Sequence, residues 1–131
     1  MKELAHLGIR QVQVPTPFPV GAVNGYVIDD PELTLIDSGP NLPGCLAALR
    51  EGLADLGCSL ETVRRVIVTH EHSDHYGLLR EVVQASGAQV FCHAEVADII
   101  EAFSRQRERM RLYFLDLYRE LGVPASVIEE F

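Results

Sequence analysis

The sequence predicts an α/β fold in which one mixed β-sheet is flanked by helices. Short runs of β-branched residues recur between residues 8 and 92, and stretches with helical apolar spacing separate them. A strand–helix–strand order predicts a crossover between parallel strands. Two early strands joined by a polar turn predict an antiparallel hairpin. The 131 residues, 47% of them hydrophobic, are enough for one domain with its own core.

Three strands are expected in the first part of the chain. Residues 8–14 alternate apolar and polar side chains, as a strand with one buried face does. Prolines alternate through residues 15–19, which we interpret as a loop with Phe18 packed on the core; a substrate-facing Phe18 is the alternative. Residues 22–28 and 33–36 form the expected hairpin, and the second of these strands ends at Asp37.

Two helices and two further strands follow. Leucines recur at spacings of three and four over residues 42–57, with Asn41 as the expected N-cap and Gly57 as the C-cap. Residues 65–69 are expected to form a buried strand and residues 77–86 a helix that stops at Gly87. Residues 88–92 read as a last short strand.

A long helix is expected from Ala94 to about Leu121. Its apolar stripe is interrupted near Arg107, and its arginines do not gather on one face. We expect these arginines to be solvated, with local partners such as Glu101 and Glu108. A role in gripping an anionic substrate is the alternative. Residues 125–131 have the pattern of a further helix.

Composition restricts the partners and the compartment. The formal charge of −8, from 11 basic and 19 acidic residues, argues against a broad nucleic-acid surface. Cys45, Cys58 and Cys92 form an odd set without a Cys-x-x-Cys pair, so we expect reduced thiols in a cytoplasmic protein. The first residues lack an apolar signal core and no run has membrane-spanning length, so no membrane association is expected.

The most informative stretch is residues 69–77, Thr-His-Glu-His-Ser-Asp-His-Tyr-Gly. It places His70, His72, Asp74 and His75 directly after the 65–69 strand. Imidazole and carboxylate are common zinc ligands, and open α/β sheets place ligand sites at the carboxyl ends of strands. Residues two apart in an extended segment point the same way, which lets His70 and His72 converge. A polar turn that happens to be rich in histidine is the alternative reading. His93 lacks a neighbour with ligand spacing, so we expect a capping or structural role for it.

This stretch resembles the His-x-His-x-Asp-His motif of the metallo-β-lactamase fold hydrolases. Residues 33–39, Leu-Thr-Leu-Ile-Asp-Ser-Gly, are similar to the family's strand that ends in Asp-Ser/Thr-Gly. His75 directly after Asp74 is similar to the glyoxalase II branch, whereas many secreted lactamases have Arg there. The resemblance implies that residues 1–131 are the amino-terminal half of an αββα sandwich, with residues 93–131 as a helical segment.

The resemblance also implies residue roles. His70 and His72 would hold one metal ion, and Asp74 and His75 would hold a second. The ions would be zinc, with iron or manganese as alternatives. Asp74 would also handle a proton. Asp37 would support the site from behind the ligands; the alternative is that Asp37 belongs to a turn without a role in the site.

The implied activity is hydrolysis of an ester, thioester or amide bond in a small-molecule substrate. Three further ligands would come from the family's second half, which this sequence does not contain, so the chain alone is expected to be inactive. An iron-dependent oxygenase of the persulfide dioxygenase type and a non-catalytic module are the alternatives. A sheet without its partner sheet would have two apolar faces, so we expect the isolated chain to form a homodimer.

Overall fold

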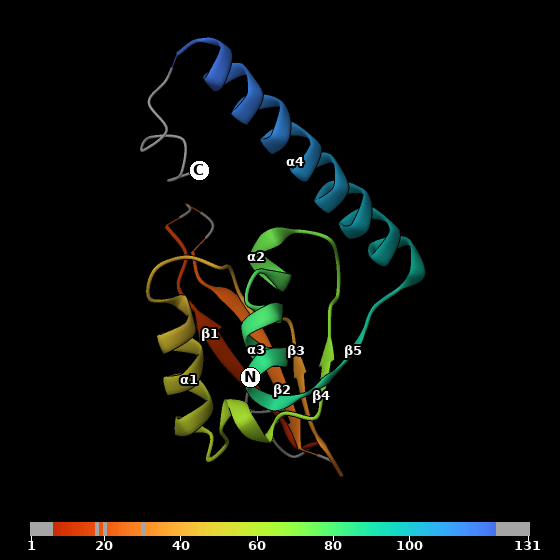
Figure 1. Cartoon of the computed structure of the whole chain (residues 1–131). Coiled ribbons are helices and arrows are strands. Elements are labelled where there is room, and N and C mark those ends of the chain that lie inside the picture. The colour runs from red at the N-terminus through yellow and green to blue at the C-terminus, as the bar shows by residue number, and fades with distance from the viewer. Residues whose placement is uncertain (1–6, 18, 20, 30, 123–131) are drawn as a thin grey trace. The chain divides into compact units, whose positions relative to one another are not determined.

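The computed structural model describes residues 7–17, 19, 21–29 and 31–122 of the chain (Figure 1). The chain divides into two compact units, with the boundary between Val96 and Ala97, and each unit is described by itself. The expectations for Phe18 and for a helix over residues 125–131 fall outside the described residues.

The first unit is built on a five-stranded sheet in which the strands are ordered as they occur in the chain. Its strands are β1 (Ile9–Val14), β2 (Val23–Asp29), β3 (Leu33–Ile36), β4 (Arg65–Ile67) and β5 (Gln89–Phe91). Strands β1, β2 and β3 pair antiparallel, and β4 pairs parallel with both β3 and β5. The predicted mixed sheet, the hairpin and the parallel pairing across the first helix are therefore confirmed.

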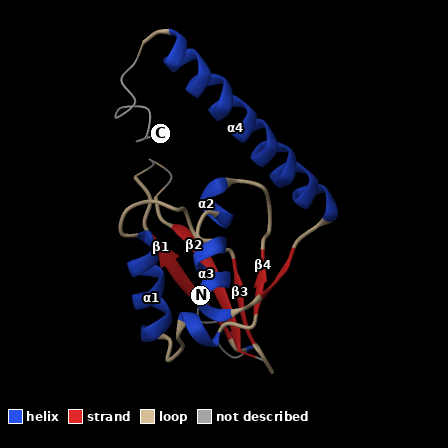
Figure 2. Ribbon diagram, in the orientation of Figure 1, coloured by secondary structure: helices blue, strands red, loops and turns tan. Residues whose placement is uncertain are grey.

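Two helices cover one face of this sheet. They are α1 (Cys45–Asp55) and α3 (Leu79–Ser86), which lie on the same side of the strands in Figure 2. Leu49 and Leu53 of α1 and Val82 of α3 are completely buried against Leu35 and Val66 of the central strands. Burial of such apolar surface is the main favourable term in folding, so this face forms the core of the unit.

The start of α1 differs from the prediction. The helix begins at Cys45, and Gly44 is the N-cap residue with φ +84° and no side-chain cap. A left-handed residue ends the preceding turn, in which the Cys45 N–H donates to the Leu42 carbonyl at 3.1 Å. Asn41 was expected to be the cap, and this was wrong: its amide instead donates to Glu81 Oε1 at 3.3 Å.

The opposite face of the sheet is mixed in character. Ile67 and Phe91 are 37% and 47% exposed there, next to each other on β4 and β5. On β1 and β2, however, the amides of Gln11 and Gln13 both donate to the Asn24 side chain. The expectation that both faces are apolar is therefore wrong for the β1–β2 edge, because the polar residues that alternate with the core residues face outward there.

The second unit consists mainly of α4 (Ala94–Glu120), which begins just before the boundary. Arg105 pairs with Glu101 at 2.9 Å and Arg111 pairs with Glu108 at 3.4 Å, which confirms the local partners expected for the arginines. All four side chains are largely exposed, so each pair contributes little to stability. Among the described residues, neither α4 nor any other helix is long and apolar enough to span a membrane.

Candidate metal centre

The candidate site lies where β3 and β4 end. The Asp37 N–H donates to the Ile67 carbonyl at 2.9 Å, which continues the β3–β4 pairing by one step beyond β3. This bond brings Asp37 beside Thr69, which follows the end of β4. Carboxyl ends of parallel strands meet at one edge of a sheet, which is the position expected for a ligand site.

A short helix, α2 (Ser73–Tyr76), turns the chain back toward the sheet. His72 is still extended, with φ −73° and ψ 132°, and its carbonyl accepts from the His75 N–H at 2.9 Å. No helix was expected over these residues from the sequence. One helical turn changes the direction of the side chains after His72, so Asp74 and His75 form a pair distinct from His70 and His72.

Asp37 has an unusual backbone conformation. It is the one described non-glycine residue with positive φ, at 57°. Aspartate is among the few residues that enter this region at modest cost, because its short side chain can bond locally. The conformation turns the chain from β3 into the loop that follows, and the residue as a whole is only 4% exposed.

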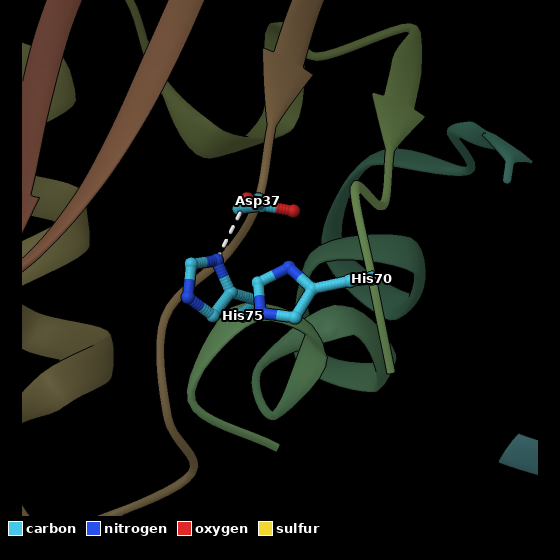
Figure 3. Close-up of side chains that lie close together, drawn as sticks. All are labelled: Asp37, His70 and His75. Atoms are coloured by element: carbon cyan, nitrogen blue, oxygen red, sulfur yellow. Dashed lines mark hydrogen bonds and ion pairs between the residues drawn. The ribbon is translucent and has the colours of Figure 1, made fainter. Parts of the chain in front are cut away.

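Both carboxylate oxygens of Asp37 have donors. The Thr69 N–H lies 2.9 Å from Oδ1, and the Thr69 hydroxyl lies 2.7 Å from Oδ2. His75 Nδ1 lies 2.8 Å from the same Oδ2 atom, as Figure 3 shows. A carboxylate can only accept, so all three groups donate to it. These bonds compensate the cost of burying the charge.

His75 is fixed by this contact. Its Nδ1 carries the proton that is donated to Asp37, which leaves Nε2 as the atom with a free lone pair. Nε2 lies 3.8 Å from Asp74 Oδ2. Both side chains are partly exposed, at 23% and 27%, so a small cation could approach the two atoms together.

His70 and His72 form the second pair. His70 Nε2 lies 3.2 Å from His72 Nδ1. Two nitrogens bound to one tetrahedral zinc at about 2.0–2.1 Å lie about 3.3–3.4 Å apart. The 3.2 Å separation, which is also that of a hydrogen bond between the two rings, is therefore compatible with one shared cation. The rings of His70 and His75 are also close, with centroids 4.0 Å apart, so the two pairs adjoin each other.

Asp37, His70 and His75 carry ligand-type atoms that lie within 4.8 Å of one another (Figure 3). This grouping alone would allow Asp37 to bind a cation directly. Its two oxygens already accept three hydrogen bonds, however, and it is the most buried of the three residues. The geometry therefore suits Asp37 as a hydrogen-bond acceptor that orients the histidines. The imidazole nitrogens and the Asp74 carboxylate together suit a borderline divalent metal.

The turn that carries the histidines is fastened to the loop after β3. The Ser38 N–H and hydroxyl both bond to the His75 carbonyl, at 2.7 and 3.2 Å. A Cβ placed on Gly77 would lie 2.4 Å from the Asn41 nitrogen, so the two backbones touch there. The sequence contained Ser38, Thr69 and Gly77 in recognisable motifs, but nothing local showed that they hold the turn in place.

His93 stands apart from these pairs. Its side chain is 72% exposed, and its Nδ1 accepts weakly from the Glu95 N–H at 3.4 Å, in the first turn of α4. This agrees with the capping role expected from the sequence.

The fold is a mixed sheet flanked by helices. At the ends of β3 and β4, one His–His pair and one Asp–His pair lie close to a buried carboxylate. These features define an α/β protein with a candidate metal centre. The protein-family model described as "Metallo-beta-lactamase superfamily" matches residues 18–130 of this sequence. The chain belongs to this superfamily.

Individual relatives agree with this assignment. The chain is 38% identical over 113 residues to the "Probable metallo-hydrolase YqjP" of Bacillus subtilis (strain 168), covering 86% of this chain and 35% of the relative. Among solved structures, it resembles a metallo-beta-lactamase family protein of Thermus thermophilus, with 31% identity, TM-score 0.70, and coverage of 94% of this chain and 41% of that one.

A more distant structural relative is MEM-A1, a subclass B3 metallo-beta-lactamase from a soil metagenome library. Its identity is 27% and its TM-score 0.57, with coverage of 70% of this chain and 32% of that one. The chain thus spans about a third to two fifths of the length of these relatives.

Proposed function

We propose that this chain provides four of the ligands of a binuclear zinc hydrolase site. The observation that supports this most strongly is the arrangement of two adjoining donor pairs over one buried carboxylate. His70 Nε2 and His72 Nδ1 lie 3.2 Å apart, and His75 Nε2 faces Asp74 Oδ2 at 3.8 Å. In this proposal the first pair holds one zinc ion and the second pair holds the other.

The chain's own residues bind and orient. Asp37 keeps the Nδ1 proton of His75 turned away from Asp74, so that Nε2 is available for a cation. Asp74 is acidic and partly exposed, which suits ligation and transfer of a proton at its free oxygen. When bound, divalent cations supply Lewis acidity that lowers the pKa of water and stabilises negative charge on a substrate oxygen.

The remaining ligands have to come from outside the described residues. Each centre has two protein ligands here, whereas catalytic zinc usually has three plus a water position. We propose that they lie in the part of the longer relatives that this chain does not cover. The substrate class would then be a small molecule with an ester, thioester or amide carbonyl, as in the glyoxalase II branch. Iron in place of zinc would instead favour an oxygenase.

We also propose a cytoplasmic location. Cys45, Cys58 and Cys92 are all free, and they differ widely in burial, from the core to the surface. An exposed thiol such as Cys92 persists in a reducing compartment more readily than outside the cell.

The proposal is tested by replacing one ligand of each pair in the full-length protein. His70→Ala and Asp74→Ala should each reduce hydrolysis of a panel of carboxylic esters, thioesters and amides to background, while the far-ultraviolet circular dichroism stays unchanged. His93→Ala, which removes an exposed histidine outside the pairs, is the matched control and should retain activity. Near wild-type turnover in either ligand variant would overturn the proposal. Metal analysis of the same protein should find zinc; stoichiometric iron with oxygen-dependent turnover would favour the oxygenase.

A further inference from the structure

Thr69 links His70 to the carboxylate that His75 contacts directly. Its hydroxyl oxygen lies 2.7 Å from Asp37 Oδ2 and 2.9 Å from His70 Nδ1. Oδ2 is also the atom that accepts from His75 Nδ1 at 2.8 Å. One oxygen atom of Asp37 is therefore connected directly to one pair and through one hydroxyl to the other.

The direction of each hydrogen bond follows from the chemistry of the groups. Asp37 as a carboxylate has no proton to give, so the single hydroxyl proton of Thr69 is donated to it. The 2.7 Å separation is in the short range typical of a hydroxyl that donates to a charged oxygen. The Thr69 oxygen is then free only to accept, and His70 Nδ1 must carry the proton of the next bond. This leaves His70 Nε2, the atom that faces His72, unprotonated.

We propose that Thr69 is a positioning residue that fixes the tautomer of His70, and that Asp37 thereby sets the metal-facing nitrogen at both centres. Asp37 acts on His75 directly and on His70 through the Thr69 hydroxyl. Metal-binding histidines commonly need such an outer acceptor, because it selects the tautomer and the ring orientation. The inference rests on the proposed metal site, but the tautomer itself is a property of the metal-free chain.

Two features make Thr69 suited to this role. Its own N–H donates to Asp37 Oδ1 at 2.9 Å, so backbone and side chain grip the same carboxylate and fix its plane. Threonine is also restricted in χ1 because it is branched at Cβ, which keeps the hydroxyl between its two partners. Serine retains the hydroxyl without this restriction, and valine retains the shape without the hydroxyl.

The test uses the whole chain without metal. Proton–nitrogen correlation spectra of ¹⁵N-labelled protein, recorded at alkaline pH, distinguish the Nδ1–H tautomer from the Nε2–H tautomer of each histidine ring. In the wild type, His70 and His75 should both carry the proton on Nδ1. In Thr69→Val, His70 should lose this preference while His75 keeps it, because His75 bonds to Asp37 directly. Thr69→Ser should resemble the wild type.

Zinc alone is the second probe. Thr69→Val should weaken zinc binding by about tenfold or more, the usual effect of removing a partner of a ligating histidine. Thr34→Val is the matched control, because it removes a buried threonine hydroxyl whose bond among the described residues is to the Glu32 carbonyl, at 3.2 Å. It should leave the His70 tautomer unchanged. Thr69→Ala serves as a second hydroxyl-free variant if valine disturbs the fold.

The outcomes separate this inference from the proposed function. An unchanged His70 tautomer in Thr69→Val and Thr69→Ala would overturn it, as would a Thr69→Ser variant that behaves like Thr69→Val. Neither result depends on catalysis, since no hydrolysis is measured. If the protein proves not to be a hydrolase, the tautomer result still decides the role of Thr69.

Discussion

His75 Nδ1 lies 2.8 Å from Asp37 Oδ2, and the two residues are 38 positions apart in the sequence. This contact joins the end of β3 to the one-turn helix α2 and determines which nitrogen of His75 is free. A second pair of bonds, from Ser38 to the His75 carbonyl, reinforces the same junction. The orientation of the candidate ligands therefore depends on the loop after β3 as much as on their own turn.

Removal of the Asp37 carboxylate should affect stability and metal binding together. Asp37→Ala would leave three donors without an acceptor, which we expect to cost about 1–3 kcal/mol in the free energy of unfolding. Zinc affinity should fall by about 10- to 100-fold because the histidines lose their outer acceptor. Urea unfolding and zinc titration measure the two effects. Asp37→Asn is the matched control for the backbone conformation, because asparagine also tolerates positive φ. Equal zinc affinity for the wild type and Asp37→Ala would refute the role of Asp37.

Gly77 should not tolerate a side chain. A Cβ there would lie 2.4 Å from the Asn41 nitrogen and 2.9 Å from the Pro40 carbonyl carbon, and neither backbone atom can move alone. We expect Gly77→Ala to destabilise the chain by roughly 3 kcal/mol, at the upper end of overpacking costs. Gly57→Ala is the comparison, because Gly57 has φ +74° with nothing within 4 Å, so only the conformational cost of about 1–2 kcal/mol applies. Equal midpoints in urea for the two variants would show that the close approach at Gly77 is absent in solution.

The isolated chain should bind zinc weakly. Each centre has two protein ligands, so each zinc ion would keep coordination positions that the chain does not fill. Tight zinc binding in structural sites comes from four protein ligands. Equilibrium dialysis should leave less than stoichiometric zinc on the chain, and no hydrolysis should be detectable. Two tightly held ions per chain would mean that further ligands come from a neighbouring copy or from residues not yet assigned to the site.

Self-association of the isolated chain is also expected. Ile67 and Phe91 form an exposed apolar area on the sheet face opposite α1 and α3. Burial of apolar area stabilises association by about 25 cal/mol per Å², before the cost of immobilising two molecules. The polar Gln13–Asn24 contact on the same face limits how much area two copies can bury. Sedimentation at micromolar concentration should show a dimer, and Phe91→Ser should shift it toward monomer. A compact monomer in the wild type would contradict this.

The sequence was sufficient for several elements in which a local pattern determines the structure. The alternation in residues 9–14, the leucine spacing of α1 and the glycine at the end of α3 each follow from neighbours a few residues away. The four candidate ligands were found for the same reason, since they lie within one short stretch. Contacts between distant segments could not be read in this way. The positive φ of Asp37, the close approach at Gly77 and the bonds made by Thr69 appear only when β3, β4 and α2 are brought together.

The start of α1 shows a different limit. Asn41 and Pro43 carry the residue types of a helix beginning, but Gly44 adopts a left-handed conformation and delays the helix to Cys45. The Asn41 side chain is used instead in a contact with Glu81, 40 residues away. Asn41 thus makes a long-range side-chain contact instead of a helix cap, and the local sequence gave no indication of that contact.

In the proposed site, His70 and His72 share one metal ion, and Asp74 and His75 share another. Anomalous X-ray diffraction at the zinc edge, from crystals of the full-length protein grown with zinc, would locate both ions. We expect one peak about 2.0–2.1 Å from both His70 Nε2 and His72 Nδ1, and a second about 2.0–2.2 Å from His75 Nε2 and an oxygen of Asp74. Peaks bound to Asp37 or to His75 Nδ1, or the absence of zinc from all four side chains, would show that the ligands are not paired in this way.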